Sequence, residues 1–106
     1  MDPKVKAALV AEHRATGGVA FLELPEGTLA FKAPKFEDYE RFQDKMARDK
    51  GESAAMRELV LCSMVYPKDL TAGTELLKRY PAAIARVART LQRMAGSEVE
   101  LDLKVE

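Results

Sequence analysis

The fold class is decided by residues 18–33, which read GVAFLELPEGTLAFKA. Two runs rich in Val, Phe and Leu flank the segment Pro25-Glu26-Gly27, whose composition is typical of a tight turn. The pattern predicts a β-hairpin. One face of this hairpin is expected to carry four large apolar side chains: Leu22, Leu24, Leu29 and Phe31. An isolated hairpin is only marginally stable in water, so we expect it to pack on helices or to gain a further strand.

The segment before the hairpin has helical character. Residues 3–16 are predicted to form a helix, with Asp2 as the N-cap, Pro3 in the first turn and Gly17 as the stop signal. The apolar stripe of this helix is narrow, which favours either loose docking on the domain or packing on a partner.

Residues 36–96 are predicted to form a helical core. Apolar periodicity and the positions of proline divide this region into four helices, at 36–49, 53–64, 69–80 and 81–95. The third of these helices begins at residue 69 or at Thr74. Before it, Val65-Tyr66-Pro67 is expected to end the second helix, because a residue that precedes proline disfavours the α region.

The period changes from helical to alternating at the end of the sequence. Residues 98–106 read EVELDLKVE, and this alternation of polar and apolar residues predicts a half-buried strand. The strand has two possible partners, the 18–33 hairpin of the same chain or a sheet edge of another copy. The expected fold class is therefore α+β, a mainly α-helical single domain over residues 1–106 with a β-hairpin near the N-terminus and a C-terminal β-strand.

Composition excludes several classes of protein. Lys and Arg together number 17, as do Asp and Glu, so the net charge is zero and binding of polyanions by bulk charge is excluded. The single cysteine, Cys62, rules out an intramolecular disulfide. We see neither a signal peptide nor an apolar run of membrane-spanning length, and we expect a cytoplasmic protein with no membrane partner.

Local charge is less uniform than the total. Residues 78–93 contain five basic side chains and no acidic one, and Arg86, Arg89 and Arg93 share one helical face. Residues 97–106 carry four acidic side chains and one lysine. We expect the basic face to be solvated or to contact protein, including this acidic segment, and consider nucleic acid an unlikely partner because interleaved aromatic residues are missing.

The sequence offers little catalytic chemistry. His13 is the only histidine and has no local partner, so we interpret it as a surface residue of a helix. Cys62 lies in an apolar segment and is expected to be a small buried thiol. Four carboxylates (Glu37, Asp38, Glu40 and Asp44) alternate with basic residues, which favours ion pairs on a solvated helix face over a cation site. No catalytic, cofactor-binding or metal-binding residue is predicted, and we expect no enzyme and no cofactor.

Five segments in a fixed order resemble a known family. They are FKAP at 31–34, YERF at 39–42, LVLCSMVYP at 59–67, LLKRYP at 76–81 and LQRMAG at 91–96. This ordered set is similar to the small tail assembly chaperones of long-tailed bacteriophages and related tail-like particles. The resemblance covers about residues 19–96 and leaves the helix at 3–16 and the strand at 98–106 unmatched.

The resemblance implies a non-enzymatic protein that binds the tape measure protein, and possibly the tail tube protein, during tail morphogenesis in the host cytoplasm. We expect such a chaperone to self-associate as a homo-oligomer. The alternative interpretations are a structural subunit of a phage or tail-like particle and a small nucleic-acid-associated regulator.

Candidate interaction residues come from three segments. They are Phe36, Tyr39, Phe42 and Met46; Arg86, Arg89 and Arg93; and Val99, Leu101, Leu103 and Val105. The first group has core packing as its alternative role, and the last group has strand pairing within the chain.

Overall fold

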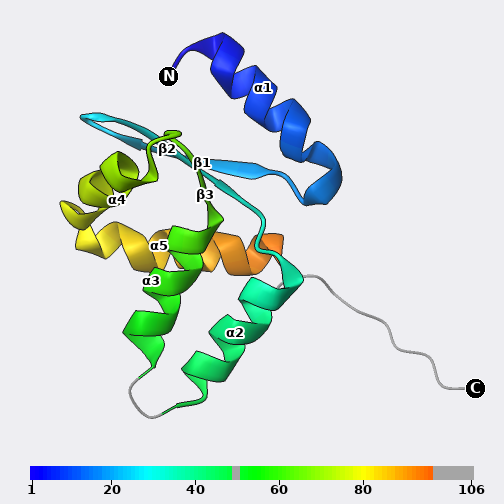
Figure 1. Cartoon of the computed structure of the whole chain (residues 1–106), viewed down its shortest axis with the longest axis vertical. Helices are drawn as coiled ribbons and strands as arrows, with labels where there is room; N and C mark the ends of the chain where they lie inside the picture. The colour runs from blue at the N-terminus through cyan, green and yellow to red at the C-terminus, as the bar shows by residue number, and fades with distance from the viewer. Residues whose placement is uncertain (49–50, 97–106) are drawn as a thin grey trace, which may run out of the picture.

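The predicted hairpin is present in the computed structural model, which describes residues 1–48 and 51–96. Strand β1 (Val19–Leu24) pairs antiparallel with strand β2 (Gly27–Lys32) across a two-residue turn (Figure 1). Leu22 lies opposite Leu29, and Ala20 lies opposite Phe31. Residues that face each other in an antiparallel pair share a face of the sheet, so the predicted apolar face is confirmed.

A third strand occupies a place where the sequence predicted only a break. Strand β3 (Met64–Tyr66) pairs antiparallel with β2, with Met64 opposite Phe31 and Tyr66 opposite Ala30. The same preference for extended backbone before Pro67 that ends the helix also suits a strand. The order β1-β2-β3 leaves the outer edge of β1 without a strand partner among the described residues. The predicted strand at 98–106 lies outside the described residues.

The N-terminal helix has the predicted start and a slightly different end. Helix α1 (Pro3–His13) is followed by a 3₁₀ turn, η1 (Arg14–Thr16). The backbone N–H of Lys4 donates to Asp2 Oδ1 at 2.8 Å, as expected of an N-cap. Gly17 ends the helical segment with a φ of 107°, in the left-handed region that favours glycine. None of the residues of α1 is buried.

Four further helices confirm the helical region. They are α2 (Phe36–Met46), α3 (Glu52–Ser63), α4 (Leu70–Lys78) and α5 (Pro81–Met94). Helix α4 begins at Leu70 because the Asp69 side chain accepts from the backbone N–H groups of Thr71 and Ala72, which makes a start at Thr74 wrong. Gly96, with a φ of 97°, follows the end of α5.

One continuous core joins the sheet to the helices, as an α+β single domain requires. Helix α1 lies on one side of the sheet, whereas α2, α3 and α5 lie on the other (Figure 1). The largest fully buried apolar side chains come from β2, α3, α4 and α5: Leu29, Phe31, Leu59, Val60, Leu77 and Leu91. Burial against the helices thus stabilises the apolar face of the hairpin. A hairpin alone would be only marginally stable in water.

Truncation of a buried leucine should lower the free energy of unfolding much more than truncation of an exposed one. Leu59 is 1 % exposed, so Leu59→Ala is expected to lower the free energy of unfolding by about 2–5 kcal/mol. Leu70 is 48 % exposed, and Leu70→Ala should change it by less than about 1 kcal/mol. Urea denaturation of both variants measures the difference, and equal losses would contradict the described core.

Candidate protein-binding surfaces

The four predicted interaction residues of α2 do not form one accessible face. Phe42 is buried in the core, and the Tyr39 ring packs beside it with the ring centroids 5.5 Å apart. Phe36 is 76 % exposed and Met46 is 40 % exposed, at opposite ends of the helix. The stripe is therefore divided between core packing and two separate exposed side chains.

Several of the charged side chains on α2 and α3 form ion pairs with one another. Arg41 donates to Asp38 Oδ1 at 2.7 Å and lies 3.7 Å from Glu58 Oε1. Lys45 donates to the other carboxylate oxygen of Glu58. Over residues 1–48 and 51–96, no group of three His, Cys, Asp or Glu side chains is arranged to hold a metal ion.

Cys62 is exposed, and the prediction of a buried thiol is wrong. The buried side of α3 consists of Ala55, Leu59, Val60 and Ser63. Cys62 lies outside that side of the helix, and its thiol donates to the Leu59 carbonyl at 3.4 Å. Partial desolvation, followed by the nearby Asp38 carboxylate, raises the pKa of the thiol. A raised pKa lowers the thiolate fraction, which disfavours a nucleophilic role.

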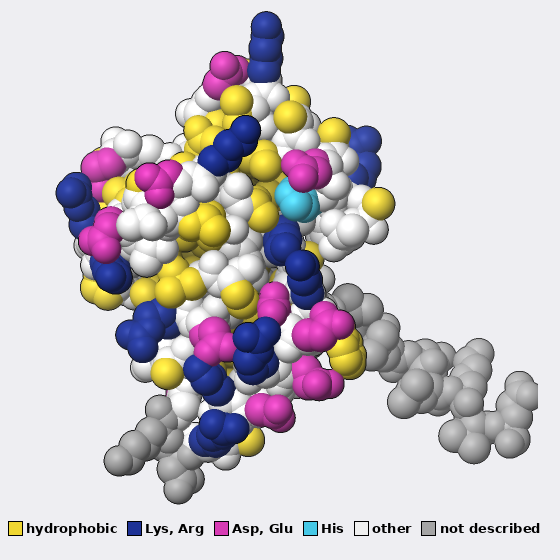
Figure 2. Space-filling model, in the orientation of Figure 1, with side chains coloured by type: hydrophobic (Ala, Val, Ile, Leu, Met, Phe, Trp, Pro, Cys, Tyr) yellow, Lys and Arg dark blue, Asp and Glu magenta, His cyan; other side chains and the backbone are white. Residues whose placement is uncertain are grey.

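A groove with apolar walls lies between α1 and the β3–α4 region, and we call it the α1–β3 groove. Its volume is about 980 Å³. Val5 and Leu9 form one wall, and Val65, Tyr66 and Leu70 contribute to the other. In the space-filling view, hydrophobic side chains gather between α1 and the rest of the domain (Figure 2).

Polar side chains surround this groove. The lining includes Glu12 and His13 from α1, Lys32 from β2 and Lys68 from the loop after β3. His13 is therefore not simply a solvated helix residue, since it lies half-buried at one end of an apolar groove. Sequence reasoning missed this site, because its two walls are brought together only by tertiary structure; the narrow stripe of α1 was the one available signal.

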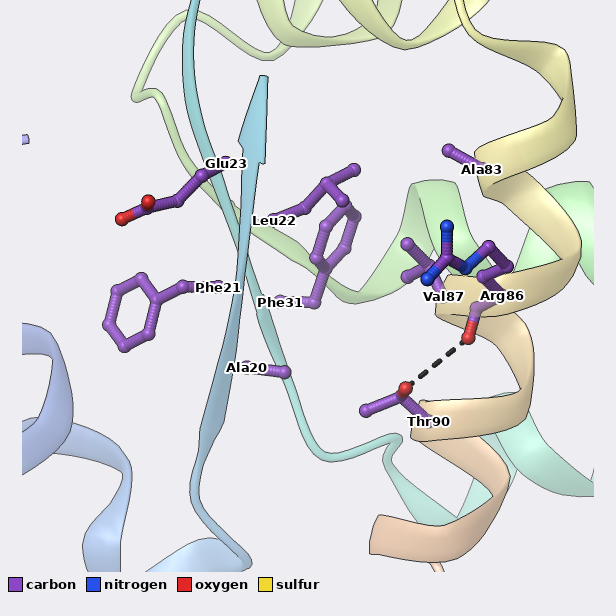
Figure 3. Close-up of a pocket in the computed structure, with 9 residues that line it drawn as sticks. All are labelled: Ala20, Phe21, Leu22, Glu23, Phe31, Ala83, Arg86, Val87 and Thr90. Atoms are coloured by element: carbon purple, nitrogen blue, oxygen red, sulfur yellow. Dashed lines mark hydrogen bonds between the residues drawn. The ribbon is translucent and has the colours of Figure 1, made fainter. Parts of the chain in front are cut away.

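A second, smaller groove lies between β1 and α5, and we call it the β1–α5 groove. Its volume is about 340 Å³. Ala20, Leu22 and Phe31 point from the sheet toward Val87 and Ala83 of α5, whereas Phe21 and Glu23 point the opposite way (Figure 3). Arg86 also lines the groove.

The three predicted arginines of α5 are all exposed. None of Arg86, Arg89 and Arg93 forms an ion pair with a carboxylate in the part of the chain that the structure describes. The predicted basic face is therefore present, with Arg86 at the groove. The residues Val99, Leu101, Leu103 and Val105 lie outside the described residues.

One long-range hydrogen bond lies at the end of the β1–α5 groove where the hairpin turn meets the start of α5. The Tyr80 hydroxyl, just before α5, donates to Glu26 Oε1 in the hairpin turn. This hydrogen bond raises the pKa of Tyr80, because it stabilises the protonated hydroxyl beside a carboxylate. It fastens the tip of the hairpin to the start of α5 and so holds the groove walls in place.

Comparison with known proteins identifies a family whose function is unknown. The domain of unknown function DUF6848 matches residues 23–104, and the chain belongs to this family. The match begins inside β1 and leaves out α1, whereas it includes most of the alternating segment at 98–106. No curated protein and no solved structure matches the chain. Across the described ranges, the helices are too short or too polar to cross a bilayer.

Acid should remove the stabilising effect of the pair between Lys45 and Glu58. The hydrogen bond from Lys45 is the main cause that holds the pKa of Glu58 below its ordinary value. A lowered pKa in the folded state stabilises the protein above the ordinary carboxyl pKa, and this effect is lost as pH falls through the folded pKa. Glu58→Gln should therefore lower the free energy of unfolding at pH 7 by about 0.5–1 kcal/mol, a difference that disappears in acid.

Urea denaturation at several pH values measures this dependence, with Glu75→Gln as the matched control. Glu75 pairs with Lys78 at 3.3 Å, but both side chains are about two-thirds exposed, so this substitution should have little effect at any pH. A loss for Glu58→Gln that is the same at pH 7 and in acid would contradict the assignment.

Proposed function

We propose that this protein is a non-enzymatic tail assembly chaperone that binds a tape measure protein in the host cytoplasm during tail morphogenesis. The proposal combines the sequence resemblance with one structural observation, the exposed α1–β3 groove. The groove supports binding of an apolar helical client, the class of client that a long helical ruler protein represents.

No residue of α1 is buried, and this supports a binding role for the side of the helix that lines the α1–β3 groove. All 11 residues of α1 are at least partly accessible, although Val5 and Leu9 are large apolar side chains. Leu70 on the facing wall is also among the most exposed large apolar residues of the described chain. Apolar side chains on both walls of an open groove are stabilised when a partner removes them from water.

The groove has the character of a site for an amphipathic helix. Such a helix inserts apolar side chains spaced three and four residues apart, and its polar face stays at the rim. The rim offers both signs of charge, from Glu12 and from Lys32 and Lys68. Met64, which is buried in the core, forms part of the floor of the groove.

Introducing charge into the groove should abolish client binding. The double variant Val5→Glu/Leu70→Glu places two carboxylates on opposite walls, at side chains that are 36 % and 48 % exposed and so tolerate polar groups. The matched control is Ala85→Glu, on the exposed side of α5. The test is co-expression with a tape measure protein, the proposed client, with the solubility and co-purification of that protein as readouts.

The proposal predicts that the unmodified chain and Ala85→Glu keep the client soluble and co-purify with it. The double variant should lose at least about tenfold in recovered complex, since burial of each apolar side chain contributes about 1.5–3 kcal/mol. Absence of co-purification with the unmodified chain would overturn the proposal. Recovery of the protein from purified mature particles would instead make it a structural subunit.

A nucleic-acid-associated role has one observation in its favour, the exposed arginines of α5. If Arg86, Arg89 and Arg93 contact three phosphates, affinity should fall about 40-fold between 50 and 200 mM salt. Arg89→Glu should weaken such binding, whereas Arg57→Glu on α3 should not. Failure of duplex and single-stranded DNA to bind at 50 mM salt would contradict this second role.

A further inference from the structure

We propose that the β1–α5 groove is the docking site for the segment 98–106 of a second copy of this chain, which adds to the free edge of β1 as a fourth strand. The proposal concerns self-association and holds whichever client the α1–β3 groove binds.

The edge of β1 is open and long enough to template a strand. β1 has six residues, and its one strand partner in the described chain is β2. Exposed strand edges present unpaired N–H and C=O groups that pair readily with another segment. The nine residues 98–106 would extend over about 30 Å and the six of β1 over about 20 Å, so the segment covers the whole edge.

The alternation of the segment matches the two faces of the sheet at this edge. On the face toward α5, Ala20, Leu22 and Val87 offer an apolar surface (Figure 3). A strand added there places every second side chain on this face. The four apolar residues of the segment have that spacing: Val99, Leu101, Leu103 and Val105.

The charges around the edge are also complementary. On the opposite face, where the polar side chains of the added segment would lie, Lys6 Nζ lies 5.0 Å from the centre of the Phe21 ring. Glu23 is the acidic residue of β1 on that face. The added segment carries four acidic side chains and one lysine, so a register that sets an acidic side chain beside Lys6 and the lysine beside Glu23 is favourable.

The direction of α5 favours a second copy over the same chain. Ala83 lies beside the Glu23 end of β1, and Thr90 lies nearer the Ala20 end (Figure 3). Helix α5 thus runs opposite to β1, and a segment that reversed at Gly96 and returned along the groove could pair only parallel to β1. A second copy can pair antiparallel, which is the pattern of the existing sheet and the more stable one per residue.

Reciprocal exchange would close a two-fold dimer. Each copy donates one segment and accepts one, so no edge of β1 is left free, and closed two-fold dimers are the commonest homo-oligomers. The family match extends to residue 104, so the donated segment belongs mostly to the domain that defines the family.

Sedimentation velocity and amide hydrogen exchange test the proposal. The full chain should sediment as a dimer, with slowed exchange in residues 19–23. Leu101→Asp/Leu103→Asp should be monomeric, with exchange in 19–23 at least about tenfold faster and an unchanged circular dichroism spectrum. Asp102→Ser, on the other face of the same segment, is the matched control and should stay dimeric.

A truncated chain tests the same edge independently. Residues 1–97 should be monomeric, and a synthetic peptide of residues 97–106 should bind this chain and restore slow exchange in 19–23. Lys6→Glu should weaken peptide binding, whereas Arg57→Glu should not.

Three results would overturn the proposal. A dimer that persists without residues 98–106 would place the interface elsewhere. A monomeric full chain with slow exchange in 19–23 that depends on 98–106 would mean that the segment pairs within its own molecule. Fast exchange in 19–23 of the full chain would mean that the edge is not covered.

Discussion

The structure depends on the burial of strand β2. Leu29, Ala30 and Phe31 are consecutive residues that alternate between the two faces of the sheet, and each is at most 1 % exposed. β2 therefore has to be covered on both faces and paired along both edges. β1 and β3 pair with its edges, and α3 and α5 contribute buried residues to the core below it. A three-stranded sheet with α3 and α5 on one face and α1 on the other satisfies these demands with few residues (Figure 1).

The second face of the sheet is covered less completely, and this difference creates the binding surfaces. Helix α1 lies on that side but buries none of its residues, so the α1–β3 groove stays open. Among the described residues the outer edge of β1 has no strand partner, and α5 packs against one face of β1. Both grooves thus arise where a small domain has too few elements to close its own surface.

Charge in this protein is organised between neighbouring elements. On α2 and α3, carboxylates and basic side chains pair with one another, and Glu58 receives both Lys45 and Arg41. On α5, three arginines are exposed without a carboxylate partner in the described chain. A net charge of zero therefore coexists with a basic helix face beside the β1–α5 groove. Neutrality of the whole chain thus says little about the charge that a partner meets at one surface.

The sequence was informative where local chemistry is decisive. Two apolar runs and a proline-containing turn specify the hairpin. Asp2 and Asp69 start α1 and α4 by accepting backbone N–H groups, and Gly17 and Gly96 follow the ends of the N-terminal helical segment and of α5. The same local rules could not predict that residues 64–66 form a strand, since a strand of three residues is defined by its neighbour β2. Nor could they place Cys62, because periodicity within an apolar segment does not say which side other elements will cover.

By itself, the sequence determined the fold class, the main helices, the hairpin with its inner face and the scarcity of catalytic chemistry. Tertiary structure decided that β3 takes one edge of β2, that Phe42 is buried while Phe36 is exposed, and that two grooves exist. The physical reason is that helices, turns and caps form from contacts a few residues apart, whereas a groove is a relation between surfaces distant in the chain. Val5 and Leu70 illustrate this, since they become opposite walls of one site only after the sheet has brought α1 and α4 together.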